Sequence, residues 1–577
     1  MKTLTTFILT LFISATALAG SFSSKDAHKA MFNIFTYDKQ GTLLGSGYGF
    51  FTSENGEAVA SFQLFRGASR AEVVDWKGNR LPVHRILGAS ENYDLVRFTV
   101  QGKKISALTL GGAQDLSAGN ELTLVRYSTE KKGAPQAIQV LTVDNYDAYK
   151  YLSISAPNEA ANLTCPLVDA MGKVVAVSQR NVGKDAETAC AIDARCIETL
   201  TTKMTSFMNS DLQSIMIPKA LPSTEQEAMT YIYMMGYKDS LQAHTAFNDF
   251  VETYPENVEG YVSRAAFLAR QRQYDAAEAD YAQALAKAEK DKEENERANL
   301  RPDQVHFSLS RLIYQQWVSG VQHLPEAWSL QRAYDEATLA QALSPSPDYQ
   351  LQQANCLFAM KKYQEAYDNF MVVCHDPAIQ GDKWTARART ELWYSAARSL
   401  ELAGGDSLQV LVLMDSVVAQ MNQPYDETEA RFLLERAYRL QSAGEYRRAI
   451  NDYREYESTM GPRNMTDRFY FNREQLELEC KMYQQALDDI QSAMAINPTD
   501  PTYPVEQAYI LLRAGLYKET VQACDEMIQV VKDNPDYYKF RGIALGELGK
   551  KREARESLLK AQSLGDPNIE VLLERYK

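Results

Sequence analysis

Short runs of alternating apolar and polar residues fill the chain from residue 28 to about residue 205. Such alternation is typical of half-buried strands, and turn pairs such as Asn55-Gly56 predict tight hairpins between them. Strands are predicted at 122–127, 137–143 and 173–178. About 180 residues of short strands fit two packed six-stranded barrels. A helix over Ile197–Met208 is expected to close this part of the chain.

The period of the apolar positions changes from 2 to 3.6 at about Glu225 and keeps that value to the end of the chain. Residues 210–224 carry Pro218 and Pro222 between the two patterns, so we expect a linker there. The sequence therefore predicts a multidomain chain: an all-β domain at 20–209, a linker at 210–224 and an all-α domain at 225–577.

One pattern recurs through the helical half: an aromatic residue, alanine three positions later, and a bulky apolar residue four positions after that. The clear copies begin at Tyr274, Tyr363, Tyr446 and Tyr483. The last three copies, which begin at Tyr483, Tyr517 and Lys551, are spaced by 34 residues. A small residue lies about twelve positions before the centre of most copies, at Ala265, Ala354, Ala437, Ala508 and Gly542.

This pattern resembles tetratricopeptide (TPR) repeats, in which small residues let the two helices of a unit approach closely. The resemblance implies a TPR-repeat α-solenoid over 225–577 with about eight or nine units. A solenoid presents a continuous concave groove, so the expected partners are proteins or peptides bound along that groove.

Composition limits the remaining function classes. The net charge of −14 argues against nucleic acid as a partner, because a phosphate backbone repels an acidic protein. The six histidines are scattered and form no H-E-x-x-H motif. Gly45-x-Gly47-x-Gly49 lacks the strand-turn-helix context of a dinucleotide fingerprint, and no phosphate-binding loop is present. We therefore expect no metal and no cofactor.

The first residues predict export. A lysine at position 2, an apolar run over Phe7–Ile13 and the small-residue site Ala17-Leu18-Ala19 are typical of a signal peptide at 1–19. The alternative is an N-terminal membrane anchor, although the apolar run is short for a span. We expect a periplasmic or cell-envelope protein with no transmembrane span in its mature chain. No cysteine follows the cleavage site, so a lipoprotein anchor is not indicated.

Seven cysteines are spread along the chain without a C-x-x-C pair. Cys165, Cys190 and Cys196 fall in the β domain, where an oxidising compartment permits a disulfide between two of them. The sequence leaves this pairing open. The other four fall in apolar helical patterns and are expected to be small buried hydrophobes.

The segment from Ala161 to Val177 includes Leu163-Thr164-Cys165-Pro166-Leu167-Val168. It resembles the nucleophile segment of trypsin-like serine proteases of the HtrA type, and the resemblance places the nucleophile position at Leu163. The histidine position falls on Gln63, in Ala60-Ser61-Phe62-Gln63-Leu64, and the third triad position is retained as Asp94. A carboxamide cannot act as a general base near neutral pH, and an aliphatic side chain cannot attack a carbonyl.

The glycines that aim backbone amides at the oxyanion are also replaced, at Ala161, Thr164 and Cys165. The sequence thus predicts a pseudoprotease with no catalytic residues at its degenerate triad positions Gln63, Asp94 and Leu163. Together with the repeats and the signal peptide, this resembles envelope proteins of Gram-negative bacteria such as Bacteroidetes.

We expect a non-catalytic interaction scaffold, in which the TPR groove binds partners and the protease-like domain is a docking module. Two alternatives stay open. One is a serine-protease-like peptidase with a displaced nucleophile, Thr164, assisted by Asp94. The other is a β domain that is only a structural cap on the repeat array.

Overall fold

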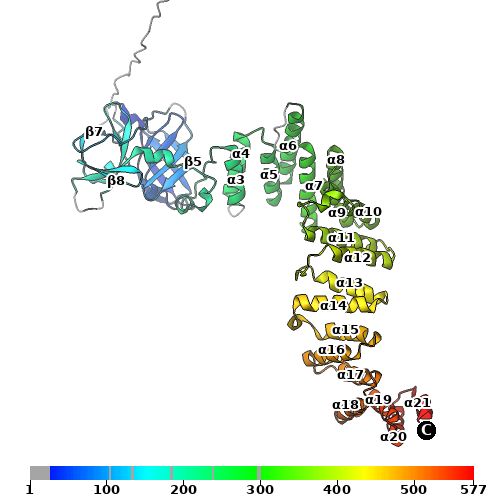
Figure 1. Cartoon of the computed structure of the whole chain (residues 1–577). Helices are drawn as coiled ribbons and strands as arrows, with labels where there is room; N and C mark the ends of the chain where they lie inside the picture. Colours follow the sequence, from blue (N-terminus) through cyan, green and yellow to red (C-terminus); the bar gives the residue numbers. More distant parts are fainter. Residues whose placement is uncertain are drawn as a thin grey trace, which may run out of the picture. The chain divides into compact units, whose positions relative to one another are not determined.

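The computed structural model describes residues 26–576, apart from 103–104, 131–134, 182, 184–185, 237–239 and 295–299. The expected signal peptide at 1–19 lies outside the described residues. The chain forms two compact units, 1–300 and 301–577. Two β-barrels and the helices up to residue 294 belong to the first unit, and the helices from residue 302 onward belong to the second (Figure 1).

The first barrel is closed and antiparallel, with the strand order β1-β2-β3-β6-β5-β4. Its strands are β1 (Met31–Tyr37), β2 (Leu43–Phe51), β3 (Glu57–Ala60), β4 (Arg70–Asp75), β5 (Arg80–Ser90) and β6 (Leu95–Val100). The predicted Asn55-Gly56 turn lies between β2 and β3, where Gly56 has a positive φ of 92°. Phe32, Phe51 and Phe98 are buried in the core of the barrel, where the Phe32 ring packs at a steep angle against the other two.

The second barrel is closed in the order β10-β11-β12-β9-β8-β7. Its strands are β7 (Glu121–Leu124), β8 (Gln136–Tyr146), β9 (Tyr149–Ile154), β10 (Pro166–Val168), β11 (Val174–Gln179) and β12 (Ala189–Asp193). These confirm the predicted double barrel, since β7, β8 and β11 lie where alternation predicts strands. All seven cysteines are free thiols, so the disulfide that the sequence left open is not formed here.

The predicted helix over Ile197–Met208 is wrong. Two short 3-10 helices, η3 (Ala194–Thr199) and η4 (Ser206–Met208), stand in its place. The segment between them is hydrogen-bonded to β5, where the Thr202 hydroxyl donates to the Leu87 carbonyl at 2.9 Å. Gly88 also approaches the Leu200 backbone so closely that a Cβ on Gly88 would lie 2.2 Å from the carbonyl carbon of Leu200. These tertiary contacts override the helical pattern of the sequence.

The first half of the expected linker at 210–224 belongs to the first barrel. It begins with helix α2 (Ser210–Gln213), and Leu212, Ile215 and Ile217 join the core of the first barrel. The Ile86 amide of β5 donates to the Pro218 carbonyl at 2.9 Å, and the Ala220 amide returns a bond to Ile86 at 2.8 Å. The backbone therefore leaves the barrel only after residue 220.

The helical part begins at Glu225, where the period change predicts it. The helices of the first unit that follow the barrels are α3 (Glu225–Met235), α4 (Ser240–Thr253), α5 (Val258–Arg270) and α6 (Tyr274–Glu294). Those of the second are α7 (Pro302–Val318), α8 (Leu330–Leu343), α9 (Pro347–Ala359), α10 (Tyr363–Cys374), α11 (Ala386–Leu402), α12 (Ser407–Gln420), α13 (Arg431–Ser442), α14 (Tyr446–Met460), α15 (Asp467–Glu479), α16 (Tyr483–Ile496), α17 (Thr502–Arg513), α18 (Tyr517–Val530), α19 (Pro535–Glu547), α20 (Lys551–Ser563) and α21 (Ile569–Arg575).

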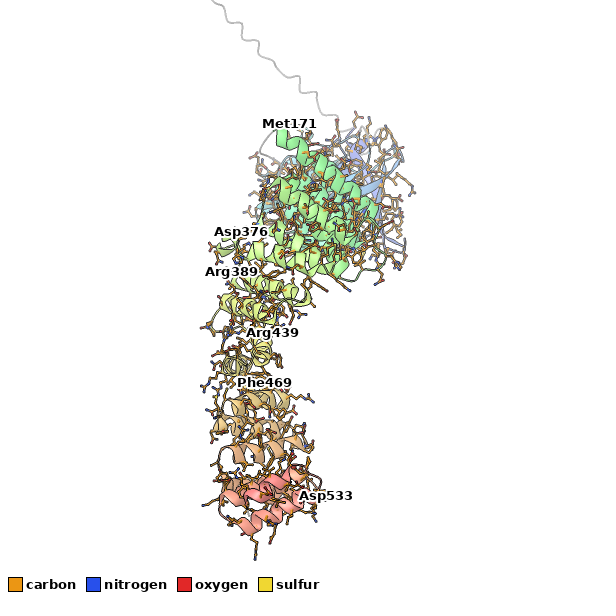
Figure 2. The ribbon with its side chains drawn as sticks, turned by 90° about the vertical axis from the view of Figure 1, so that its right-hand side faces the viewer. Met171, Asp376, Arg389, Arg439, Phe469 and Asp533 are labelled. Carbon is orange, nitrogen blue, oxygen red and sulfur yellow. The ribbon has the colours of Figure 1, made fainter. Side chains whose placement is uncertain are left out.

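Within the second unit each helix packs mainly on its neighbours in sequence, in the manner of a solenoid. Figure 2 shows the side chains of this stack, with Arg389, Arg439 and Phe469 on every second helix, α11, α13 and α15. Two of the small residues of the sequence pattern, Ala437 on α13 and Ala449 on α14, are fully buried in one hydrophobic core. None of the helices in the described ranges has the length and apolar character that a bilayer crossing needs.

A recurring ion pair joins the two helices of a repeat, and the sequence analysis missed it. An arginine on the first helix makes two hydrogen bonds with an aspartate 16 residues later, in the pairs Arg264–Asp280, Arg436–Asp452 and Arg473–Asp489. The same guanidinium reaches back to the preceding repeat, at Asn248, Asp415 and Glu457 respectively. We call this series the arginine ladder. At the equivalent position Arg541 meets Ser557 at 2.5 Å instead of an aspartate.

Candidate active site

Asp94 lies just before β6 with a positive φ of 45°. Its carboxylate accepts the Ser61 hydroxyl at 2.9 Å and the backbone amide of Gln63 at 3.0 Å. Gln63 belongs to the short helix α1 (Phe62–Phe65), whose N-cap residue is Ser61. The Ser61 side chain makes no capping bond itself, so Asp94, which precedes the neighbouring strand β6, satisfies this helix end.

The structure brings Gln63 and Asp94 together through the backbone of Gln63. The Gln63 side chain is exposed to solvent. Burial raises the pKa of Asp94 above its usual value, although the bonds from Gln63 and Ser61 act in the opposite direction. Asp94 thus has a complete set of partners that stabilise α1, with no imidazole among them.

Leu163 follows the 3-10 helix η2 (Ala160–Asn162), and the chain then turns through Thr164, which has a φ of 57°. Positive φ in a β-branched residue is strained. The amides of this turn have acceptors inside the protein. The Leu163 amide donates to Ala160 at 3.3 Å, the Thr164 amide to the Ser178 carbonyl at 3.0 Å and the Cys165 amide to the Ser178 hydroxyl at 2.9 Å.

An oxyanion hole requires amides that are free to point at the substrate oxygen. The three amides from Leu163 to Cys165 are instead bonded within the second barrel. Thr164 is only 5% exposed, and burial raises the pKa of the neighbouring Cys165 thiol to about 12. Neither residue therefore offers an ionisable, accessible nucleophile near neutral pH.

Two imidazoles lie in the barrels. His28 is 2% exposed, and neither of its ring nitrogens has a hydrogen-bond partner. His84 on β5 meets Gln101 at 3.1 Å and its neighbour Arg85 at 3.4 Å. Burial, and then the charge of Arg85, lowers the pKa of His84. Within the described part of the barrels, neither ring is hydrogen-bonded to a hydroxyl group.

The residue before Asp94 links the two barrels. The Tyr93 carbonyl accepts the Gln179 side-chain amide of β11, and its hydroxyl donates to Asp147 at 3.0 Å. Its ring packs edge-on against Tyr149 of β9, with centroids 5.6 Å apart. The sequence analysis missed both Tyr93 and Ser61. Ser61 had a readable signal, because it is an N-cap residue type directly before an apolar turn.

In the described ranges no group of three or more His, Cys, Asp or Glu side chains is placed to hold a metal ion. The three triad positions carry an amide at Gln63, a carboxylate bonded to the Ser61 hydroxyl at Asp94 and a hydrocarbon at Leu163. Neither the Gln63 amide nor the Leu163 hydrocarbon can serve as the base or the nucleophile of a triad.

Asp94→Ala is expected to lower the stability of the first barrel by about 1–2 kcal/mol, because the helix end and the Ser61 hydroxyl lose their acceptor. Asp94→Asn keeps one carbonyl oxygen and should lose less. Thermal and urea unfolding of the purified chain measure both. An Asp94→Ala protein as stable as the unmodified chain would contradict the capping role.

A family model of the trypsin-like peptidase domain matches residues 45–177. Two solved structures of the HtrA-type protease AlgW with tripeptide, one of them a variant, are similar at 17% identity and a TM-score of 0.27. They cover 33% and 32% of this chain. The chain in turn spans 64% and 61% of the length of those structures, which is less than two thirds. No curated protein matches the chain.

Proposed function

We propose that this chain is an exported, non-catalytic interaction protein whose trypsin-like domain docks a polypeptide and whose helices form a TPR scaffold. The observation that carries the proposal is the use of Asp94 as a cap for α1, with the amide side chain of Gln63 in place of a base. Leu163 at the nucleophile position and the internally bonded amides beside it support the same conclusion.

The TPR assignment is supported by the 34-residue spacing of the last copies and by the small residues buried between paired helices. Such an array binds partners along an extended surface instead of in a single pocket. The strands of a protease-like barrel can pair with an extended peptide through main-chain hydrogen bonds without cleaving it. The signal peptide that the sequence predicts at 1–19 supports a location in the periplasm or the cell envelope.

The test is a search for serine-hydrolase activity in the purified chain. We expect no labelling by a fluorophosphonate probe and no cleavage of unfolded casein, with an active trypsin-like protease as the positive control. Thr164→Ala and Asp94→Ala are the matched variants. Labelling or cleavage that disappears in Thr164→Ala would overturn the proposal in favour of a displaced nucleophile.

A second candidate function, that of a structural cap, is favoured by one observation. The Arg85 guanidinium of β5 makes two hydrogen bonds with Asp249 of α4, at 2.6 and 2.7 Å, and both side chains are largely buried. The barrel is thereby fastened to the first helices. If a fragment that begins at residue 225 captures the same envelope proteins as the whole chain, the barrels act as a cap and not as a docking module.

A further inference from the structure

A polar pocket of about 510 Å³ opens in the second unit between α13, α15 and the start of α14. The side chains that matter for its chemistry are Tyr438, Gln441 and Ser442 at the end of α13, Tyr446 at the start of α14, and Gln475 and Glu479 on α15. No basic side chain belongs to the lining of this pocket in the described second unit. We call it the α13–α15 pocket.

Two tyrosine rings form its aromatic wall. Tyr438 is 46% exposed, and its ring stands edge-on to the fully buried Tyr453, with centroids 6.1 Å apart and an angle of 85° between the planes. Tyr446 is half-buried and packs on the core of the same repeats. The rings are therefore held in place before any ligand arrives, and the face of an aromatic ring attracts a cation.

One carboxyl group lines the pocket, and another is hydrogen-bonded to a lining side chain. Glu479 is exposed on its rim. Gln475 donates to the fully buried Glu474 at 2.7 Å and also bonds Glu506 of α17. The second carboxyl oxygen of Glu474 has no hydrogen-bond partner. Arg513 of α17 interacts electrostatically with Glu479, and its guanidinium is bonded to the Tyr509 hydroxyl at 2.7 Å.

We propose that the α13–α15 pocket binds the cationic side chain of a lysine or arginine in an extended partner segment. The cation would lie against Tyr438 and Tyr446 and form a charge-assisted hydrogen bond with Glu479. The inference rests on the proposed function, because it takes the helical array to be the partner-binding surface. To that function it adds the chemical class of one partner residue, a lysine or an arginine.

The buried carboxyl behind Gln475 couples this binding to protons. Burial raises the pKa of Glu474 to about 8, and Glu477, Asp489 and Glu506 add to this effect. Arg473 on the same helix is fully engaged with Asp489 and Glu457. A bound cation favours the ionised form of a nearby carboxyl, so binding releases a proton and strengthens as the pH rises.

The test is a titration of the full chain with a labelled heptapeptide of glycine and serine that carries one central lysine. Matched peptides carry arginine, Nε-acetyl-lysine or glutamate at that position. We expect the lysine or arginine peptide to bind and the other two to bind at least tenfold more weakly. Glu479→Gln and Tyr438→Ala are each expected to weaken the basic peptide about tenfold, and Glu519→Gln on the exposed side of α18 is expected to have no effect.

A second measurement follows the pH dependence. Binding of the basic peptide is expected to strengthen several-fold between pH 6 and pH 9, and Glu474→Gln should flatten this dependence while binding persists. Equal binding of the acetylated peptide, unchanged binding by Glu479→Gln, or no binding of either basic peptide at millimolar concentration would overturn the inference.

The two proposals fail in different ways. If the basic peptide does not bind but the chain stays inert towards the fluorophosphonate probe and still captures partners, only the pocket assignment is lost. If the chain is labelled by the probe, the non-catalytic function is lost whatever the peptide does.

Discussion

Glu474→Gln is expected to stabilise the region from α15 to α17 by about 4 kcal/mol at pH 9, and by no more than about 1 kcal/mol at pH 5. Glu474 is fully buried, and one of its carboxyl oxygens has no partner. It occupies the position twelve residues before Ala486, where the other clear repeats have alanine or glycine. A carboxyl group thus stands where close helix packing leaves least room for water.

The sign of the pH effect follows from the raised pKa. Burial raises the pKa of Glu474 to about 8 from an unperturbed value of 4.5. Between these values the folded protein holds a proton that the unfolded chain has lost. Stability therefore falls as the pH rises from about 5 through 8. A neutral glutamine removes this dependence because it cannot ionise.

Hydrogen exchange of the α15–α17 amides and urea unfolding, each at pH 5 and pH 9, measure the effect. Glu519→Gln, which removes an exposed carboxylate of α18, is the control and should change stability by less than about 0.5 kcal/mol. A residual pH slope is expected from Glu477, because burial raises its pKa to about 7. An unchanged slope in Glu474→Gln would show that this carboxyl is ionised in the folded protein.

Arg473→Met is expected to destabilise the same region by about 3–5 kcal/mol, because it leaves buried carboxylates without their counter-charge. The Arg473 side chain is 7% exposed and binds Asp489 and Glu457 at 2.6 and 2.7 Å. Methionine fills much of the space of the aliphatic stem but carries no charge. The loss should be larger at pH 8 than at pH 5, since burial raises the pKa of Asp489 and this carboxyl can take up a proton at the lower pH.

The matched control is Arg541→Met at the equivalent position of a later repeat. Arg541 is bonded to the neutral Ser557 and to the half-exposed Asp525, so its removal leaves no buried carboxylate without a counter-charge. We expect a loss of about 1 kcal/mol there. Urea unfolding followed by circular dichroism measures both variants. Equal losses at the two positions would mean that the arginine ladder stabilises through packing and not through charge.

The sequence predicts the parts of this fold that depend on local pattern. Alternation locates β7, β8 and β11, and the change of period places the start of α3 at Glu225. Prediction from the sequence fails where contacts between residues far apart in the chain determine the backbone conformation. Gly88 and Leu87 pin the segment near Leu200 in a non-helical form, which no pattern in residues 197–208 reveals.

The candidate site, too, is predicted from the sequence only in part. The residue types at Gln63, Asp94 and Leu163 are readable from the sequence because each lies in a recognisable local motif. The capping role of Asp94 and the engagement of the Leu163–Cys165 amides depend on Ser61 and Ser178, which only the closed barrels bring near. Glu474 was visible as an exception to the repeat, but its burial and its unpartnered oxygen come from the packing.

The path of residues 212–220 along β5 decides where the molecule can be dissected. A truncation after residue 209 would strip Leu212, Ile215 and Ile217 from a hydrophobic interior and leave both hydrogen-bonding groups of the Ile86 backbone bare. The resulting fragment would expose an unpaired strand and an apolar surface, and we expect it to aggregate. Recombinant halves divided near residue 224 keep these contacts of the barrel and lose the Arg85–Asp249 ion pair instead.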